Sequence, residues 1–360
     1  RLRASSSDWF ASPKFALPHG STPVFSWAPQ HTDRGSVQAS FNLTIWSAVG
    51  RVVWSGDAAS RQPRMRYPPD APRLEPGTYV WQVATREADG RISPPSAPSA
   101  LHVALGHGEW DGVPWLGSAS KNVYSTTFDC PAGAVTSVLY ICGLGYSRVE
   151  LNGHVLNTLT TAPWTQYAYV NGFSTLDVKD LLLVGEPNRL VVSLGRGWRD
   201  RTAFRILKGD DVASDGKVER VVRAKLVATL STGDSVALSH TGDGKWHAAA
   251  GPTTADSVYN GEEYDARVAE RLGDGPHNAI SPELWSKAAP LDEGDAPAGV
   301  MTAWAAPAVT VTDSIAPVAL TNPRKGLYVA DFGRRLTGVV RLNRMICKEG
   351  TRVILRHAEI

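Results

Sequence analysis

Three short segments decide the fold of this chain: GLGYSRVELNG (143–153), APWTQY (162–167) and LGRGWRD (194–200). The first alternates polar and apolar side chains before it ends in Asn-Gly, which predicts a strand followed by a tight turn into an antiparallel partner. The other two combine proline or glycine with tryptophan, a composition typical of loops between strands. Together the three segments predict a β-sandwich.

The composition of the whole chain favours an all-β protein. Its 360 residues include 12 Trp, 33 Gly and 24 Pro, and short apolar runs recur between turn residues. Helical periodicity is nearly absent, and VKDLLL (178–183) predicts at most one or two helical turns. A chain of this length exceeds what one core usually supports, so consecutive β-sandwiches are expected.

Four segments are expected along the chain. Residues 1–105 predict a first sandwich, residues 106–121 a linker strap, residues 122–290 a second sandwich, and residues 291–360 part of one further sheet. In the strap, Trp110 and Trp115 are expected to pin the chain to a neighbouring surface. The candidate core residues of the first sandwich are Trp27, Trp46, Trp54, Tyr79 and Trp81.

Alternation and turn residues place the individual strands. In the second sandwich we expect turns at Asn152-Gly153, Asn171-Gly172 and Gly233-Asp234. The strands expected in that sandwich are 123–130, 135–143, 147–153, 167–173, 188–195, 221–230 and 235–240, and those of the last segment are 308–315, 326–333, 338–346 and 352–360.

Charge and cysteine content exclude several classes of function. The 37 basic and 35 acidic residues leave a formal charge of +2 without a basic cluster, so nucleic acid is not an expected partner. No apolar run reaches the roughly 18 residues of a membrane helix, so no membrane is expected either. Cys130, Cys142 and Cys347 match no metal-ligand spacing and are predicted to be buried free thiols.

Aromatic and planar polar side chains gather around the three segments quoted first. Sugars are bound by aromatic faces that cover C–H patches and by amide, carboxylate or guanidinium groups that bind hydroxyls. The alternative is that the tryptophans belong to the core and that Asn152 is only the left-handed residue of a turn. The candidate carbohydrate-binding residues are Asn152, Trp164, Tyr167, Trp198, Arg199 and Asp200.

A second polar cluster lies in VYNGEEYDAR (258–267). Its charged residues can hold a hard cation, contribute carboxylates to a glycosidase site, or form a solvated ion-pair or inter-domain strip. No phosphate loop, G-x-S-x-G elbow, H-E-x-x-H or C-x-x-C motif occurs in the chain. The members of the cluster are Glu262, Glu263, Asp265 and Arg267.

The order of these motifs resembles the N-terminal half of the α-L-rhamnosidases of glycoside hydrolase family 78. The resemblance begins with the first sandwich and EWDGVPWLG (109–117), continues through GLGYSRVELNG, APWTQY and LGRGWR, and ends in YNGEEYDAR (259–267), YVADFGRRLTGVVRL (328–342) and RVILRHAEI (352–360). It implies a fibronectin III or immunoglobulin-like sandwich, then a jelly-roll carbohydrate-binding-like module, then the start of a concanavalin-like sandwich.

The resemblance also implies what these modules serve. Members of the family are inverting glycosidases that remove terminal α-L-rhamnose with carboxylates on an (α/α)6 barrel, which lies after residue 360. A rhamnose-containing glycan and that barrel are therefore the expected partners. No cofactor is required, although calcium assists sugar binding in some members. The Asn42-Leu43-Thr44 sequon can accept an N-linked glycan only in a secretory compartment. An extracellular or secretory location is slightly favoured.

Two alternatives remain beside a non-catalytic, sugar-binding region. The first is that this chain hydrolyses glycosides itself, for which only the carboxylates between Glu262 and Asp265 offer a pair. The second is a structural or adhesive protein of several β-sandwiches that binds no sugar.

Overall fold

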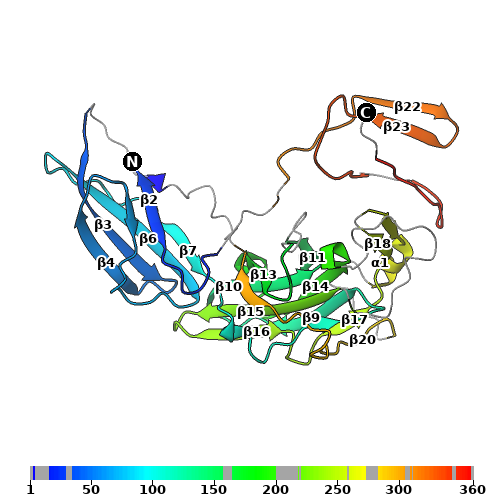
Figure 1. The fold of residues 1–360 in the computed structure, drawn as a ribbon, viewed down its shortest axis with the longest axis horizontal. Helices are drawn as coiled ribbons and strands as arrows, with labels where there is room; N and C mark the ends of the chain where they lie inside the picture. Colours follow the sequence, from blue (N-terminus) through cyan, green and yellow to red (C-terminus); the bar gives the residue numbers. More distant parts are fainter. Residues whose placement is uncertain are drawn as a thin grey trace. The chain divides into compact units, whose positions relative to one another are not determined.

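The computed structural model describes residues 3–4, 16–29, 35–156, 164–199, 218, 220–257, 259–272, 283–304, 309, 311–342 and 346–357. The chain forms two compact units, Arg1–Ala308 and Val309–Ile360 (Figure 1). Several β-sheets make up almost all of the regular structure, which confirms the all-β fold class. In the described part, no helix has the length and apolar character needed to cross a membrane.

The first unit begins with an immunoglobulin-like sandwich of two sheets, ordered β1-β2-β5 and β4-β3-β6-β7. Residues 41, 43 and 45 of β3 are buried and residues between them face outward, because successive side chains of a strand point to opposite faces. The strands are β1 (Arg3–Ala4), β2 (Val24–Ala28), β3 (Gln38–Ser47), β4 (Val52–Ala59), β5 (Arg64–Arg66), β6 (Gly77–Glu87) and β7 (Ser99–Val103).

Four of the five aromatic residues expected in this core belong to it. Trp27 and Trp81 are buried in it, and Trp54 and Tyr79 pack against it half-buried. The prediction for Trp46 is wrong: this ring follows the buried Ile45 and so lies on the other side of the strand.

The second sandwich consists of two larger sheets. One has the order β16-β15-β10-β13-β21, with β8 beside β15, and the other has the order β12-β11-β14-β9-β17-β20. The strands of the first sheet are β8 (Leu116–Gly117), β10 (Ala134–Leu144), β13 (Val170–Asp177), β15 (Val221–Leu230), β16 (Ser235–His240) and β21 (Val300–Ala303). Those of the second are β9 (Val123–Asp129), β11 (Tyr146–Leu151), β12 (His154–Val155), β14 (Pro187–Gly195), β17 (His247–Ala249) and β20 (Ser286–Lys287).

Smaller elements connect these sheets. They are the 3-10 turns η1 (Gly108–Trp110), η2 (Lys179–Leu181) and η3 (Gly197–Arg199), the hairpin of β18 (Thr253–Ser257) and β19 (Gly261–Tyr264), and helix α1 (Ala266–Leu272). The turn η2 lies inside VKDLLL, where a short helical segment was predicted. The predicted turn at Asn171-Gly172 is wrong, because both residues lie within β13 and the Asn171 amide donates to the carbonyl of Gly299 at 3.0 Å.

Strand β10 is buried on both of its faces. Leu139 and Ile141 point into the core between the two sheets, whereas Val138 and Tyr140 point to the opposite side. There the strap of residues 106–121 covers the sheet, with Trp110 fully buried and Trp115 nearly so, as predicted. A strand covered on both faces has no polar side to expose, which is why VLYICGL is a continuous apolar run.

The strap is held over this sheet by Arg223 of β15. Its guanidinium carbon lies 5.5 Å from the ring centre of Trp110 and 5.9 Å from that of Trp115. The same group donates hydrogen bonds to the backbone carbonyls of Trp110 and Val113. The strap is therefore part of the packed structure.

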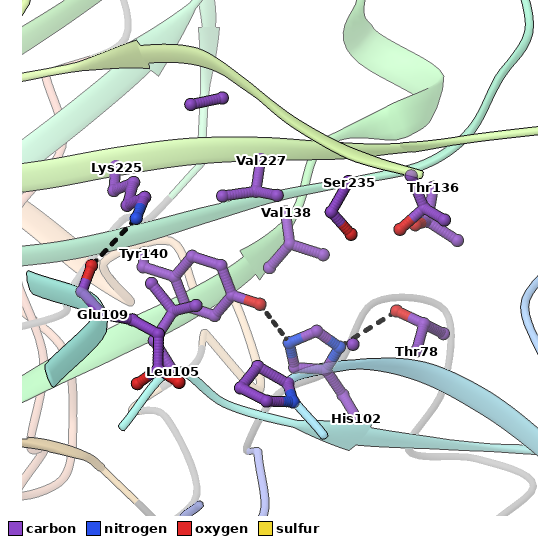
Figure 2. A pocket seen from close by; sticks show the side chains of 14 residues that line it. Thr78, His102, Leu105, Glu109, Thr136, Val138, Tyr140, Lys225, Val227 and Ser235 are labelled. Atoms are coloured by element: carbon purple, nitrogen blue, oxygen red, sulfur yellow. Dashed lines mark hydrogen bonds between the residues drawn. The ribbon is translucent and has the colours of Figure 1, made fainter. Parts of the chain in front are cut away.

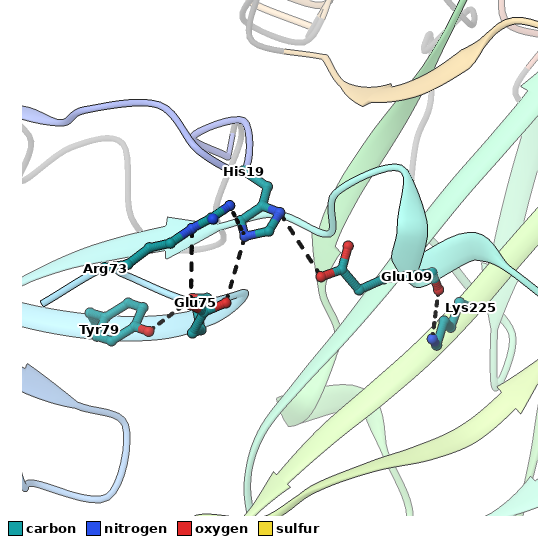
Figure 3. A network of polar contacts seen from close by, with 6 residues as sticks. All are labelled: His19, Arg73, Glu75, Tyr79, Glu109 and Lys225. Atoms are coloured by element: carbon teal, nitrogen blue, oxygen red, sulfur yellow. Dashed lines mark hydrogen bonds and ion pairs between the residues drawn. The ribbon is translucent and has the colours of Figure 1, made fainter.

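The immunoglobulin-like sandwich contacts the second sandwich through His102 of β7. The Nε2 atom of His102 lies 2.8 Å from the Tyr140 hydroxyl, and its Nδ1 atom lies 3.0 Å from the Thr78 hydroxyl (Figure 2). Nearby, His19 lies between Arg73, at 2.9 Å, and the carboxylate of Glu109, at 3.9 Å (Figure 3). The same Nε2 atom of His19 lies 3.6 Å from a carboxylate oxygen of Glu75.

The second unit contains one hairpin of β22 (Ala319–Arg324) and β23 (Leu327–Asp331). Strand β23 lies within the strand expected at 326–333, but the described residues of 308–315, 338–346 and 352–360 form no strands, so those three predictions are wrong. Almost every described side chain of this unit is exposed, so its apolar residues have no opposing layer to pack against. Cys347 is likewise exposed, whereas Cys130 and Cys142 are the expected buried free thiols.

We expect acid to weaken the contact between the two sandwiches through His102. Burial lowers the pKa of this ring from 6.5 to about 4, because the charged form is poorly solvated there. The unfolded chain therefore takes up a proton first as the pH falls. Neutral His102 stabilises the folded protein fully when the pH is above the pKa that this residue has in the unfolded chain. As the pH falls from there to the pKa of His102 in the folded protein, the free energy of unfolding decreases by roughly 3 kcal/mol in total.

Urea unfolding at about pH 7 and about pH 4.5 measures this loss. The variant His102→Gln, which has no ring to protonate, is the control and should be less stable near neutral pH but lose less stability in acid. If the free energy of unfolding fell equally with pH in the two proteins, His102 would not be the group responsible for the loss in acid.

Candidate functional site

Two glycines bring the segments around 145 and 197 into direct backbone contact. Gly145 has a φ of +99°, and a Cβ there would lie 2.0 Å from the carbonyl oxygen of Gly195. Gly197 has a φ of +53°, and a Cβ there would lie 2.7 Å from the Cα of Gly145. Neither position has room for a side chain, and only glycine at both lets the two backbones touch. This contact lies where the chain passes from the end of β14 into η3, which carries Trp198.

Within the part of the chain that the structure describes, Trp198 lies against the rings of Trp164 and Tyr259. It stacks on Trp164 with ring centres 4.9 Å apart and an interplanar angle of 16°. It also meets Tyr259 edge-on, with ring centres 6.5 Å apart and an angle of 84°. Trp164 is 60% exposed and Tyr259 is 53% exposed. We call these three residues the aromatic platform; it joins three segments that are distant in the sequence and faces solvent.

Tyr167 and Arg199 hold the chain beside the aromatic platform. The guanidinium of Arg199 donates to the carbonyls of Val218 and Asp295, the latter at 2.9 Å. Burial raises the pKa of Tyr167 to about 12, and nearby Cys142 acts in the same direction while Arg199 opposes it. Both side chains are half-buried: Arg199 joins two loops, and Tyr167 packs against the core cluster that contains Trp110 and Phe173. The sixth predicted residue, Asp200, lies outside the described residues.

The structure places Asn152 apart from this group, in the turn between β11 and β12. Its φ is +51°. Its amide donates to Leu181 O and to the Asn188 side chain, both at 2.8 Å, and its Oδ1 accepts from the backbone N–H of Arg189 at 2.9 Å. With both amide hydrogens and its oxygen engaged, Asn152 fixes the turn, as the alternative interpretation expects, and a role in sugar binding stays a prediction.

The acidic cluster of residues 262–267 forms the edge of the β18–β19 hairpin and the start of α1. Glu262 accepts a hydrogen bond from the Thr253 hydroxyl at 2.8 Å. Asp265 binds the Arg267 guanidinium at 2.7 and 2.9 Å and also accepts from its backbone N–H. The side-chain hydrogen bond from Arg267 is the largest cause that lowers the pKa of Asp265 to about 2. Glu263 is exposed next to them. Asp265 and Arg267 thus pair as the ion-pair interpretation expects.

Three residues that support the site have no clear sequence signal. The buried carboxylate of Asp256 accepts a hydrogen bond from the backbone N–H of Arg196 at 2.5 Å and lies 3.6 Å from the Arg220 guanidinium. This joins β18 to the chain leading into Trp198. No spacing links positions 196, 220 and 256, so only the fold reveals them. Tyr259 lies in the motif YNGEEYDAR, and nothing in that pattern marks it as a neighbour of Trp198.

The fold and the aromatic platform define a multidomain β-sandwich protein with a solvent-facing aromatic group. Comparison with known families identifies it further. The model of the α-L-rhamnosidase N-terminal domain matches residues 133–313, and that of the Rha78A-like N-terminal immunoglobulin domain matches residues 18–107. The chain therefore belongs to the α-L-rhamnosidase N-terminal domain family, which confirms the resemblance seen in the motifs.

Individual relatives agree with this assignment. An α-L-rhamnosidase of Streptomyces avermitilis is 29% identical over 290 residues, which cover 78% of this chain and 27% of the relative. One of Formosa agariphila is 22% identical over 364 residues, covering 89% and 37%. The solved α-L-rhamnosidase of Dictyoglumus thermophilum, at 21% identity, superimposes with a TM-score of 0.72 over 92% of this chain and 38% of that chain. The chain thus spans about a third of the relatives that it matches.

Replacing Gly145 with alanine should destabilise the protein and displace Trp198. The added methyl would meet the carbonyl of Gly195 in a backbone conformation that alanine disfavours, at an expected cost of about 2–3 kcal/mol. Gly185→Ala is a matched control, because Gly185 has a similar φ of +82° but open space around it. Denaturant unfolding followed by tryptophan fluorescence measures both variants. Similar losses in the two would show that the backbone contact does not matter.

Proposed function

We propose that this chain is the non-catalytic N-terminal region of an α-L-rhamnosidase, which binds rhamnose-containing glycans and scaffolds a catalytic (α/α)6 barrel. The aromatic platform carries the binding half of the proposal. Sugar rings present apolar C–H patches, and an exposed aromatic face covers such a patch while the hydroxyls stay hydrated. Trp164, 60% exposed and stacked on Trp198, offers a face of this kind on a fixed support.

Family membership supports the scaffolding half. The matched relatives are named as α-L-rhamnosidases, and this chain covers 27% and 37% of their lengths. In our proposal the parent enzyme hydrolyses terminal α-L-rhamnosides with inversion, using carboxylates of the barrel. The N-terminal sandwiches would then hold that barrel and deliver glycan to it.

L-Rhamnose is the first ligand to test. A solved α-L-rhamnosidase of Streptomyces avermitilis, described as complexed with L-rhamnose, superimposes on 92% of this chain with a TM-score of 0.70 at 17% identity. The likeness supports the fold, and the sugar in that structure suggests the probe. Among the described residues no group of three or more His, Cys, Asp or Glu side chains could hold a metal ion, and calcium assistance stays a prediction.

Trp164→Ala should weaken binding of L-rhamnose by about two- to tenfold, the usual contribution of one aromatic contact. Calorimetric titration with millimolar sugar measures the affinity. Tyr328→Ala removes another exposed ring, in the second unit, and should leave binding unchanged. If titration of the unsubstituted protein with L-rhamnose produces no heat, the binding half of the proposal is contradicted. The structural or adhesive alternative is then favoured.

The 360-residue chain should not turn over an aryl α-L-rhamnoside. Inversion needs two carboxyl groups about 6.5–9.5 Å apart across a cleft. Glu262 and Glu263 are neighbours in β19 and point to opposite faces of the hairpin, and Asp265 is paired with Arg267. Release of the aryl group above background, abolished by Glu262→Gln or Glu263→Gln, would instead support catalysis by this chain.

A further inference from the structure

A cavity of about 410 Å³ lies where the immunoglobulin-like sandwich covers the sheet containing β10 (Figure 2). Its floor is the outer face of β10, β15 and β16, the face opposite the main core. This volume falls within the roughly 300–1,000 Å³ of small-molecule sites. Nothing in the aromatic platform takes part in its lining.

The register of the three strands arranges the floor in rows. Thr136 pairs with Thr229, which pairs with Ser235, so three hydroxyls form one row. The next row is apolar: Val138 pairs with Val227, which pairs with Ala237.

A third row contains Tyr140 beside Lys225. At about 3.3 Å per residue, the hydroxyl row and the Lys225 row lie about 13 Å apart, with the apolar strip between them.

The opposite wall comes from the first sandwich and the strap. Thr78, His102 and Leu105 line the cavity, and Glu109 of η1 lies close to Lys225. The hydrogen bond between His102 and Tyr140 closes one end. Ser235 and Ala237 are exposed, so the cavity opens toward β16.

Hydrogen-bonding capacity is left over inside the cavity. Within the described part of the chain, the hydroxyls of Thr136, Thr229 and Ser235 have no hydrogen-bond partner in the protein. The ammonium of Lys225 donates to the backbone carbonyl of Glu109 at 2.8 Å, and two of its three donors have no partner among the described residues.

The cavity is balanced in charge. The lining contains one cation, Lys225, and one anion, Glu109, and its other groups are uncharged at neutral pH. The ammonium of Lys225 binds the backbone carbonyl of Glu109, whose carboxylate points toward His19 (Figure 3). A ligand with a net charge would therefore disturb this balance, whereas one with several hydroxyls could both donate and accept.

We propose that this cavity binds a neutral, monosaccharide-sized polyol. One face of the ligand would lie on the strip of Val138, Val227 and Ala237. Its hydroxyls would bind the hydroxyl row at one end and Lys225 with Glu109 at the other. An apolar floor between polar ends matches a sugar ring, which has C–H groups on its faces and hydroxyls at its rim. This site is separate from the aromatic platform, and the inference does not depend on the proposed function.

Saturation-transfer NMR with L-rhamnose, D-galactose and D-galacturonate at millimolar concentration tests the site. The protein is the full chain carrying Trp164→Ala, which lowers the affinity of the aromatic platform. We expect signals from the neutral sugars and a weaker signal from galacturonate. Adding Ala237→Trp, which fills the cavity from its open side, should reduce the neutral-sugar signal to the level that the weakened aromatic platform gives.

A milder variant guards against misfolding. Thr229→Val keeps the shape of the floor and removes one hydroxyl, so it should weaken affinity about three- to tenfold, as expected for one hydrogen bond. Thr44→Val, in β3 of the first sandwich, is the matched control and should leave affinity unchanged.

Two results would overturn the proposal. The first is that neither Ala237→Trp nor Thr229→Val reduces any sugar signal. This result would show that the cavity holds only water. The other is a preference for galacturonate, which would show an anion site. Because every protein compared here carries Trp164→Ala, a failure of sugar binding at the aromatic platform changes neither outcome.

Discussion

Burial of β10 on both of its faces is the constraint on which the rest of the first unit depends. Its inward residues, such as Leu139, form the core of the second sandwich, and its outward residues, such as Tyr140, need a cover of their own. The strap supplies that cover with Trp110 and Trp115, and Arg223 holds it in place. The immunoglobulin-like sandwich covers the remaining part through His102. Loss of the strap would expose large apolar groups of a central strand, so docking of the first sandwich is tied to the stability of the second.

The aromatic platform depends on a second constraint, the contact between two backbones. Gly145 and Gly197 allow the chain after β10 to touch the chain after β14, and this contact sets where Trp198 projects. Asp256 then ties the β18–β19 hairpin to the same place, which brings Tyr259 alongside. The segments that carry Trp198 and Tyr259 are thus held by hydrogen bonds and backbone contacts, which would limit the side-chain freedom lost if a ligand bound there.

Local patterns in the sequence predicted most of the strands, because alternation reports directly on which side of a strand is buried. The same rule explains the errors. Trp46 is a large apolar residue of the kind expected in a core, but the neighbouring Ile45 takes the inward position on the strand. Asn171-Gly172 has the composition of a turn, yet β21 pairs with it from 130 residues away. The strands expected after residue 337 need an opposing layer to form. The contact of Asp256 with Arg196 and Arg220 joins distant positions, so no window of sequence contains it.

The cavity and the contact between sandwiches share residues, so ligand binding and docking must be linked. His102 and Thr78 belong to the first sandwich, while Tyr140 and Lys225 belong to the second, and all four line the cavity. A ligand that touches both walls binds only the docked arrangement, and it stabilises docking by an amount that grows with its concentration relative to its Kd. Protonation of His102 acts in the opposite direction, because the charged ring is poorly solvated in the docked state. By reciprocity, acid must then weaken ligand binding wherever it weakens docking, even though the ligand itself carries no charge.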